Sequence, residues 1–247
     1  MRVLLLGGTT EAGLMARALA EAGIAAEYSY AGRTDAPLPQ PVPVRVGGFG
    51  GMAGLAAHLR TGGFTHVIDA THPFAAAMSG NAVAACAAAG VRLIAYERAG
   101  WQAGPGDDWQ DVADIGAAAQ ALAGPPRRVF LAIGRQHLGA FAGQPQHDYL
   151  LRLVDAPQGA LPLPRAEVVI ARGPFDVAGD VAVMQRHGTQ VVVAKNAGGS
   201  GAAAKLAAAR ALGLRVIMIA RPAVPLRLVA RDVAGVMGWL HPAGLSG

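Results

Sequence analysis

The sequence RVLLLGGTTEAG at residues 2–13 decides the fold. Residues 2–8 form a continuous β-prone run that ends in glycine, which is typical of a strand buried on both faces. A helix-forming segment follows from Glu11 to Ala22 and ends at Gly23. A strand, a glycine turn and a helix in this order indicate a parallel sheet, because parallel strands are joined by helical crossovers.

The same alternation continues along the chain. Further strands are predicted at 25–31, 44–46, 65–71, 91–96, 128–133, 149–154, 168–171, 191–194 and 215–220. Further helices are predicted at 51–60, 74–89, 115–123, 176–187, 202–212 and 232–240, with a short one at 136–141. The alternation lapses between residues 97 and 109, where glycine, proline and acidic residues gather. We therefore predict an α/β protein of two Rossmann-like lobes, residues 1–110 and 111–247, with the active site in the cleft between them.

Composition narrows the class of protein. The chain has 247 residues, of which 53% are hydrophobic and 15% charged, which suits folded domains with a buried core. No polar-free stretch of about 18 residues occurs, and the apolar run at the N-terminus is too short for a signal peptide. Cys86 is the only cysteine and cannot form an intramolecular disulfide. These features predict a cytoplasmic protein without a membrane anchor.

The charge indicates the kind of ligand. The formal net charge is +5, and Lys195 and Lys205 are the only lysines among 21 basic residues. The arginines are scattered rather than clustered, which disfavours nucleic acid as a partner. Arginine suits planar recognition of carboxylates and phosphates, so the composition favours a small polyanion. The seven histidines are dispersed without the spacing of a zinc site, so no metal ligands are predicted.

The first turn after the opening strand is a candidate phosphate loop. Its glycines allow close approach of a pyrophosphate, and the following helix N-terminus offers N–H groups. The consensus G-x-G-x-x-G is absent, since a threonine stands at the second glycine position, and an ordinary capped glycine turn is the alternative. The predicted cofactor residues of this turn are Gly7, Gly8, Thr9, Thr10 and Glu11.

The end of the second strand predicts the coenzyme. NAD-binding chains place Asp or Glu there, whereas this chain has Arg33 after Ser29 and Tyr30. An arginine beside hydroxyl groups favours the 2′-phosphate of NADPH, the alternative being a solvated loop arginine. Gly48 and Phe49 are expected on the adenosine side, unless they only form a tight turn.

Asp69, Thr71 and His72 end another strand and are expected near the nicotinamide. His72 is predicted to donate a proton or a hydrogen bond, with Asp69 orienting it and Thr71 contacting the cofactor. The alternative is that Asp69 or Thr71 only caps the next helix.

In the second half, cationic side chains follow four strands and are predicted to converge on one anionic ligand. These residues are Arg135, Arg172, Lys195 and Arg221. A second anion-binding turn, without the G-K-[ST] ending of a Walker A loop, is predicted at Asn196, Gly198, Gly199 and Ser200.

These motifs, taken together, resemble the precorrin-6A reductase family of cobalamin biosynthesis. The matching segments are GGTTEA at 7–12, AGRT at 31–34, GGFGG at 47–51, DATHPFA at 69–75, IGR at 133–135, ARGPF at 171–175 and KNAGG at 195–199. The resemblance implies NADPH-dependent reduction of the C18=C19 bond of precorrin-6A, a tetrapyrrole polyanion, to precorrin-6B. It further implies that the first lobe binds NADPH and the second binds substrate carboxylates.

Several alternatives stay open at this stage. The substrate can be the cobalt-containing equivalent or another anionic molecule, although no Tyr-x-x-x-Lys pair of short-chain reductases occurs. Water or acidic positions of the substrate can replace His72 as the proton donor. A nucleotide-sensing module or a nucleic-acid binder is the alternative from another class. The oligomeric state is also open, a monomer included.

Overall fold

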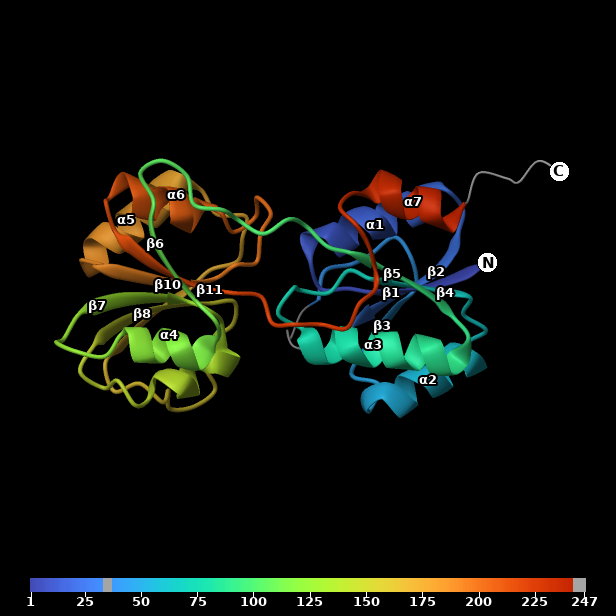
Figure 1. Cartoon of the computed structure of the whole chain (residues 1–247), viewed down its shortest axis with the longest axis horizontal. Helices are drawn as coiled ribbons and strands as arrows, with labels where there is room; N and C mark the ends of the chain where they lie inside the picture. The colour runs from blue at the N-terminus through green and yellow to red at the C-terminus, as the bar shows by residue number, and fades with distance from the viewer. Residues whose placement is uncertain (33–36, 242–247) are drawn as a thin grey trace. The chain divides into compact units, whose positions relative to one another are not determined.

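The structure is a computed structural model, and it describes residues 1–32 and 37–241 (Figure 1). The chain forms two compact units. The first comprises Met1–Ala99 with Ala223–Gly247, and the second comprises Gly100–Pro222.

The first unit is built on a parallel sheet of six strands in the order β12-β5-β4-β1-β2-β3. The strands are β1 (Arg2–Leu6), β2 (Ala25–Tyr30), β3 (Val44–Val46), β4 (His66–Asp69), β5 (Arg92–Tyr96) and β12 (Leu228–Ala230). Strand order reverses between β1 and β4. The carboxyl ends of these two strands are therefore the expected ligand site of a doubly wound fold.

Helices cover both faces of this sheet (Figure 1). They are α1 (Thr10–Glu21) and α7 (Val233–Leu240) on one face, and α2 (Gly51–Thr61) and α3 (Ala76–Ala89) on the other. Alternate residues of β1 enter the two cores: Leu5 packs with α1 and α7, and Leu4 packs with α2 and α3. The apolar run predicted to be buried on both faces is therefore confirmed.

The second unit is also built on a six-stranded parallel sheet, in the order β6-β11-β10-β7-β8-β9. The strands are β6 (Asp108–Val112), β7 (Arg128–Ala132), β8 (Asp148–Leu153), β9 (Ala166–Ile170), β10 (Val191–Lys195) and β11 (Arg215–Ile219). The helices α5 (Val177–His187) and α6 (Ala204–Ala211) cover one face, and α4 (Ile115–Ala121) with the 3₁₀ helix η1 (Arg135–Phe141) covers the other. The prediction of two Rossmann-like α/β lobes is confirmed.

The division of the chain differs from the predicted one. The first unit ends at Ala99 rather than near residue 110, and residues from Ala223 onward return to it instead of staying in the second lobe. The reason is that β12 pairs with β5, while Val236 and Leu240 of α7 enter the core of the first unit. Both β6 and β12 were missing from the sequence prediction, because charged residues interrupt the sequence DWQDV of β6 and β12 is only three residues long.

None of the helices in the described ranges combines the length and apolarity that a membrane crossing requires.

Candidate active site

The glycine loop between β1 and α1 is the first part of the candidate site. Thr9 is the N-cap of α1, and its Oγ1 accepts a hydrogen bond from the N–H of Ala12 at 3.1 Å. The same hydroxyl donates to the main-chain oxygen of Ala70 at 2.7 Å. Thr9 thus both caps the helix and ties the loop to the end of β4. The N–H groups of Thr10 and Glu11 stand in the first turn of α1, where no helical residue lies four positions earlier to accept a hydrogen bond.

Tyr28 lies beneath this loop and explains its glycines. A Cβ atom on Gly7 would stand 2.2 Å from Cζ of Tyr28, so no larger residue fits there. The N–H of Gly8 donates to Oη of Tyr28 at 2.8 Å, and burial raises the pKa of this phenol. Gly8 itself has φ of +107° and open space on its Cβ side. Tyr28 is not among the site residues predicted from the sequence, because a tyrosine within a strand is typical of an ordinary core.

The tip of β2 carries Ser29 and Tyr30. Ser29 is buried, and its Oγ accepts a hydrogen bond from Nη1 of Arg45 at 3.0 Å. The Oη of Tyr30 donates to the main-chain oxygen of Leu38 at 2.9 Å. The predicted phosphate ligand, Arg33, lies outside the described residues. Arg45 is thus the arginine that the structure shows at this tip, and the sequence analysis did not select it.

Asp69, Thr71 and His72 follow β4 as predicted, but their contacts differ from the expected ones. Oδ1 of Asp69 accepts hydrogen bonds from Oγ1 of Thr71 at 2.7 Å and from its N–H at 3.2 Å. Nδ1 of His72 accepts from the N–H of Phe74 at 3.2 Å. The carboxylate of Asp69 therefore organises the turn through Thr71. Its role in orienting His72 stays a prediction.

Buried charges surround this turn. Oδ2 of Asp69 lies 3.9 Å from Nε of Arg227, and the two side chains are 2% and 8% exposed. Neither atom has a hydrogen-bond partner among the residues that the structure describes. Nη2 of Arg227 also pairs with Oε2 of Glu97 at 2.8 Å. Arg227 precedes β12, so only the return of the chain to the first unit places it here.

Glu11, predicted at the cofactor, forms an ion pair with Arg98, and both side chains are largely buried. Its carboxylate is therefore engaged within the protein. The main-chain N–H of Glu11, rather than its side chain, is the group suited to a phosphate.

In the second unit, Trp101 holds the predicted anion-binding turn. Oδ1 of Asn196 accepts from the N–H of Trp101 at 2.7 Å, and Nδ2 donates to its main-chain oxygen at 2.9 Å. Nε1 of Trp101 donates to the oxygen of Gly199 at 2.8 Å. Gly198 and Gly199 have φ of +70° and +73°, in the left-handed region that favours glycine. The amide of Asn196 thus holds the loop, and its assignment to the substrate stays a prediction.

The four predicted cations differ in their surroundings. Arg221 donates to the main-chain oxygens of Asn196 at 2.9 Å and Ala197 at 3.1 Å, so it also holds the loop. Arg135 is exposed after β7, and Lys195 is buried at the end of β10. Arg221 follows β11, Lys195 ends β10 and Arg135 follows β7, and these three strands are neighbours in the sheet. Arg172 follows β9, which β8 separates from β7, and lies 3.9 Å from the carboxylate of Asp155.

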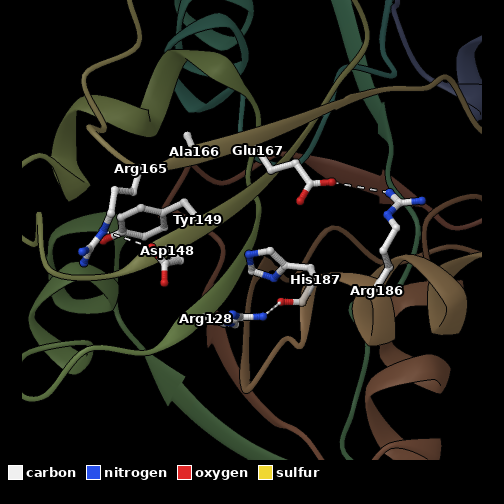
Figure 2. Close-up of a pocket in the computed structure, with 8 residues that line it drawn as sticks. All are labelled: Arg128, Asp148, Tyr149, Arg165, Ala166, Glu167, Arg186 and His187. Carbon is white, nitrogen blue, oxygen red and sulfur yellow. Dashed lines mark hydrogen bonds and ion pairs between the residues drawn. The ribbon is translucent and has the colours of Figure 1, made fainter.

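A cavity of about 390 Å³ lies at the amino ends of the strands of the second sheet, away from the predicted ligand residues at their carboxyl ends (Figure 2). Its walls come from the first residues of β7, β8 and β9 and from the end of α5. Figure 2 shows that its arginines have partners: Arg165 pairs with Asp148, Arg186 with Glu167, and Arg128 donates to the main-chain oxygen of His187. Ligands of open α/β sheets bind at the carboxyl ends of the strands, so this cavity is not the candidate active site.

Comparisons with known proteins agree with this architecture. The family model described as precorrin-6x reductase CbiJ/CobK matches residues 2–241. A precorrin-6A reductase of Rhodobacter capsulatus is 61% identical over 243 residues, covering 98% of this chain and 97% of the relative. One of Sinorhizobium sp. is 47% identical, covering 98% and 95%. A cobalt-precorrin-6A reductase of Priestia megaterium is 30% identical, covering 90% and 91%.

A solved structure also matches. The protein named CobK precorrin-6A reductase superposes with a TM-score of 0.95 at 61% identity, covering 99% of this chain and 97% of that one. The resemblance found in the sequence motifs is confirmed. The chain belongs to the precorrin-6x reductase family.

Proposed function

We propose that this chain catalyses the NADPH-dependent reduction of the C18=C19 bond of precorrin-6A, giving precorrin-6B in cobalamin biosynthesis. The observation that carries the proposal is the glycine loop at the β1/β4 reversal of the first sheet, tied to β4 by Thr9, in a member of this family. Metal-free precorrin-6A is preferred over its cobalt form because the relative named for it is 61% identical, against 30% for the cobalt-precorrin-6A reductase of Priestia megaterium.

The residues of the first unit suit a dinucleotide. The positive φ and open side of Gly8 leave room above the loop, and the N–H groups of Thr10 and Glu11 face outward from the helix N-terminus. We assign Gly7 and Gly8 with these N–H groups to the pyrophosphate, and Ser29, Tyr30 and Arg33 to the adenosine ribose. Phe49 and Gly48 fit its adenine side, and Thr71 the nicotinamide side. When bound, NADPH would supply the hydride.

His72 is the proposed proton or hydrogen-bond donor toward the macrocycle. Because its Nδ1 accepts from a main-chain N–H, the proton of the neutral ring is on Nε2. The imidazole is exposed, and Nε2 is the atom through which we expect it to donate to a substrate atom. Water and the acidic positions of the substrate remain the alternative proton sources. Asp69 acts on this step indirectly, by holding the turn through Thr71.

The second unit is assigned to the substrate carboxylates. Arg135, Arg172 and Lys195 are the proposed charged contacts, with Ser200 and the N–H groups of Gly198 and Gly199 as neutral donors. Asn196 and Arg221 support them by fixing the loop. The proposed compartment is the cytoplasm, in keeping with a single, unpaired cysteine.

The direct test is anaerobic incubation with precorrin-6A and NADPH, with NADPH oxidation and the absorption of the macrocycle followed together. We expect turnover with precorrin-6A and slower turnover with the cobalt form. A folded sample that binds NADPH but leaves both macrocycles unchanged would favour an oxidoreductase acting on another anionic substrate.

Coenzyme choice is tested separately by thermal protection. We expect NADPH to raise Tm more than NADH at equal concentration, since the ligand that binds the folded state more tightly stabilises it more. Arg33→Ala should raise the KM for NADPH much more than it lowers kcat. The exposed Arg17→Ala on α1 provides a control for the lost charge.

A further inference from the structure

Arg45 is held in one position at the tip of β2. It lies on β3 directly opposite Ser29 in the register of the sheet. Its Nη1 donates to Oγ of Ser29 at 3.0 Å and to the oxygen of Gly47 at 2.8 Å, and its Nη2 donates to the oxygen of Gly48 at 3.2 Å. Its Cζ lies 3.9 Å from the ring centroid of Phe49. Three hydrogen bonds and an aromatic ring therefore fix the guanidinium plane.

Among residues 1–32 and 37–241, no carboxylate forms an ion pair with Arg45. Its hydrogen-bond partners there are neutral oxygens, and its other contact is the ring of Phe49. Glu27, two residues before Ser29, instead faces His58 at 2.9 Å and Arg2 at 3.7 Å. Many other arginines of the unit, such as Arg98 and Arg227, do pair with carboxylates. Within the part of the chain that the structure describes, this tip therefore carries a positive charge that no carboxylate offsets.

The guanidinium also keeps donors for a ligand. An arginine has five N–H groups, and three are used by Ser29, Gly47 and Gly48. The N–H of Nε and one N–H of Nη2 remain. Gly47 and Gly48 leave open space beside it, since a Cβ atom on either would meet nothing within 4 Å. A ligand can therefore reach the guanidinium beside the two glycines.

The position in the fold identifies the ligand group. In doubly wound sheets the adenosine ribose lies at the end of β2, about 20 residues beyond the glycine loop, and a carboxylate there accepts the 2′-hydroxyl of NAD. Here the corresponding tip presents a buried serine hydroxyl and a fixed guanidinium. A phosphate, with its negative charge and several acceptor oxygens, suits these donors better than a neutral 2′-hydroxyl with one oxygen.

We propose that Arg45 is a specificity-determining residue that contacts the 2′-phosphate of NADPH. The inference rests on the proposed coenzyme and deepens it, and it is independent of Arg33. Because Ser29, Phe49 and the Gly47–Gly48 carbonyls hold the guanidinium before the ligand arrives, little side-chain freedom is lost on binding. The contact discriminates between the two coenzymes, since only one of them carries the phosphate.

The test is isothermal titration of the full chain with NADP⁺ and with NAD⁺, without substrate. Arg45→Gln should weaken NADP⁺ binding about 10–100-fold, the loss typical of a charge-assisted hydrogen bond, and leave NAD⁺ binding nearly unchanged. Arg45→Lys, which keeps the charge but loses the planar fork, should fall between the two. Arg60→Ala is the matched control, since that arginine lies in the last turn of α2 and donates to the main-chain oxygen of Ala88.

Each outcome decides between the two proposals. A parallel loss of NADP⁺ and NAD⁺ affinity in Arg45→Gln would mean that Arg45 only shapes the loop, and it would overturn the inference. So would an NADP⁺ preference that survives the substitution. Equal binding of both coenzymes by the unsubstituted chain would instead overturn the proposed NADPH dependence itself.

Discussion

Replacing Asn196 by alanine tests whether the amide of this residue holds the loop after β10. Its amide makes two hydrogen bonds with the main chain of Trp101, at 2.7 and 2.9 Å, across a separation of 95 residues. The substitution removes both and leaves the N–H and C=O of Trp101 without these partners. Gly100 fits the same arrangement, since a Cβ atom there would stand 3.1 Å from Oδ1 of Asn196.

The expected loss follows from these two bonds. Each hydrogen bond contributes about 1 kcal/mol net, and an unsatisfied group that is partly buried adds to the cost. We therefore expect Asn196→Ala to lower the free energy of unfolding of the second unit by about 2 kcal/mol. For a unit of this size that is a fall in Tm of roughly 6–10 °C.

Tryptophan fluorescence during urea unfolding is a suitable assay, because Trp101 is the residue that the amide holds. Gln102→Ala is the matched control: this amide is exposed beside Trp101, and its removal should change stability by less than about 0.5 kcal/mol. If Asn196→Ala were as stable as the control and only raised the KM for precorrin-6A, the structural reasoning would be wrong. Asn196 would then be the substrate ligand that the sequence predicted.

Two further predictions concern the first unit and the pH range of stability. Gly7→Ala should destabilise the protein by about 2–3 kcal/mol, because its Cβ would stand 2.2 Å from the buried Tyr28 ring. Gly13→Ala is the control: its Cβ would meet only Gln40, at 3.9 Å, so this variant should be neutral or stabilising. Equal thermal denaturation midpoints for the two variants would contradict this reasoning. Burial lowers the pKa of His66 and of His187 below 6.5, so the folded state resists protonation that the unfolded chain accepts. Their stabilising contribution is therefore present above pH 6.5 and is lost as the pH falls below it; Tm measured from pH 8 to 5 should show this fall, and the fall should be smaller in His66→Gln and His187→Gln.

Much of the fold followed from local sequence. Parallel α/β lobes were predicted from the apolar run at residues 2–6 and from the helices after Gly8 and Gly50. This was possible because the spacing of hydrophobic residues and the positions of glycines can be read from neighbouring residues alone. The motifs also placed Thr9, Asp69 and the four cations at the carboxyl ends of strands, where the structure has them. They were sufficient to identify the family.

The tertiary structure decided which of these side chains are available to a ligand. Asn196 and Arg221 read as substrate ligands in the sequence, but they hold the loop after β10. Arg227 joins Asp69 only because β12 returns to the first sheet, and Arg45 meets Ser29 only through the pairing of β2 with β3. The sequence determined most of the elements and their order, since these depend on local propensity, but not the strands β6 and β12. The pairing of charges and amides depends on strand register and on contacts between residues far apart in the chain, so only the folded structure could show it.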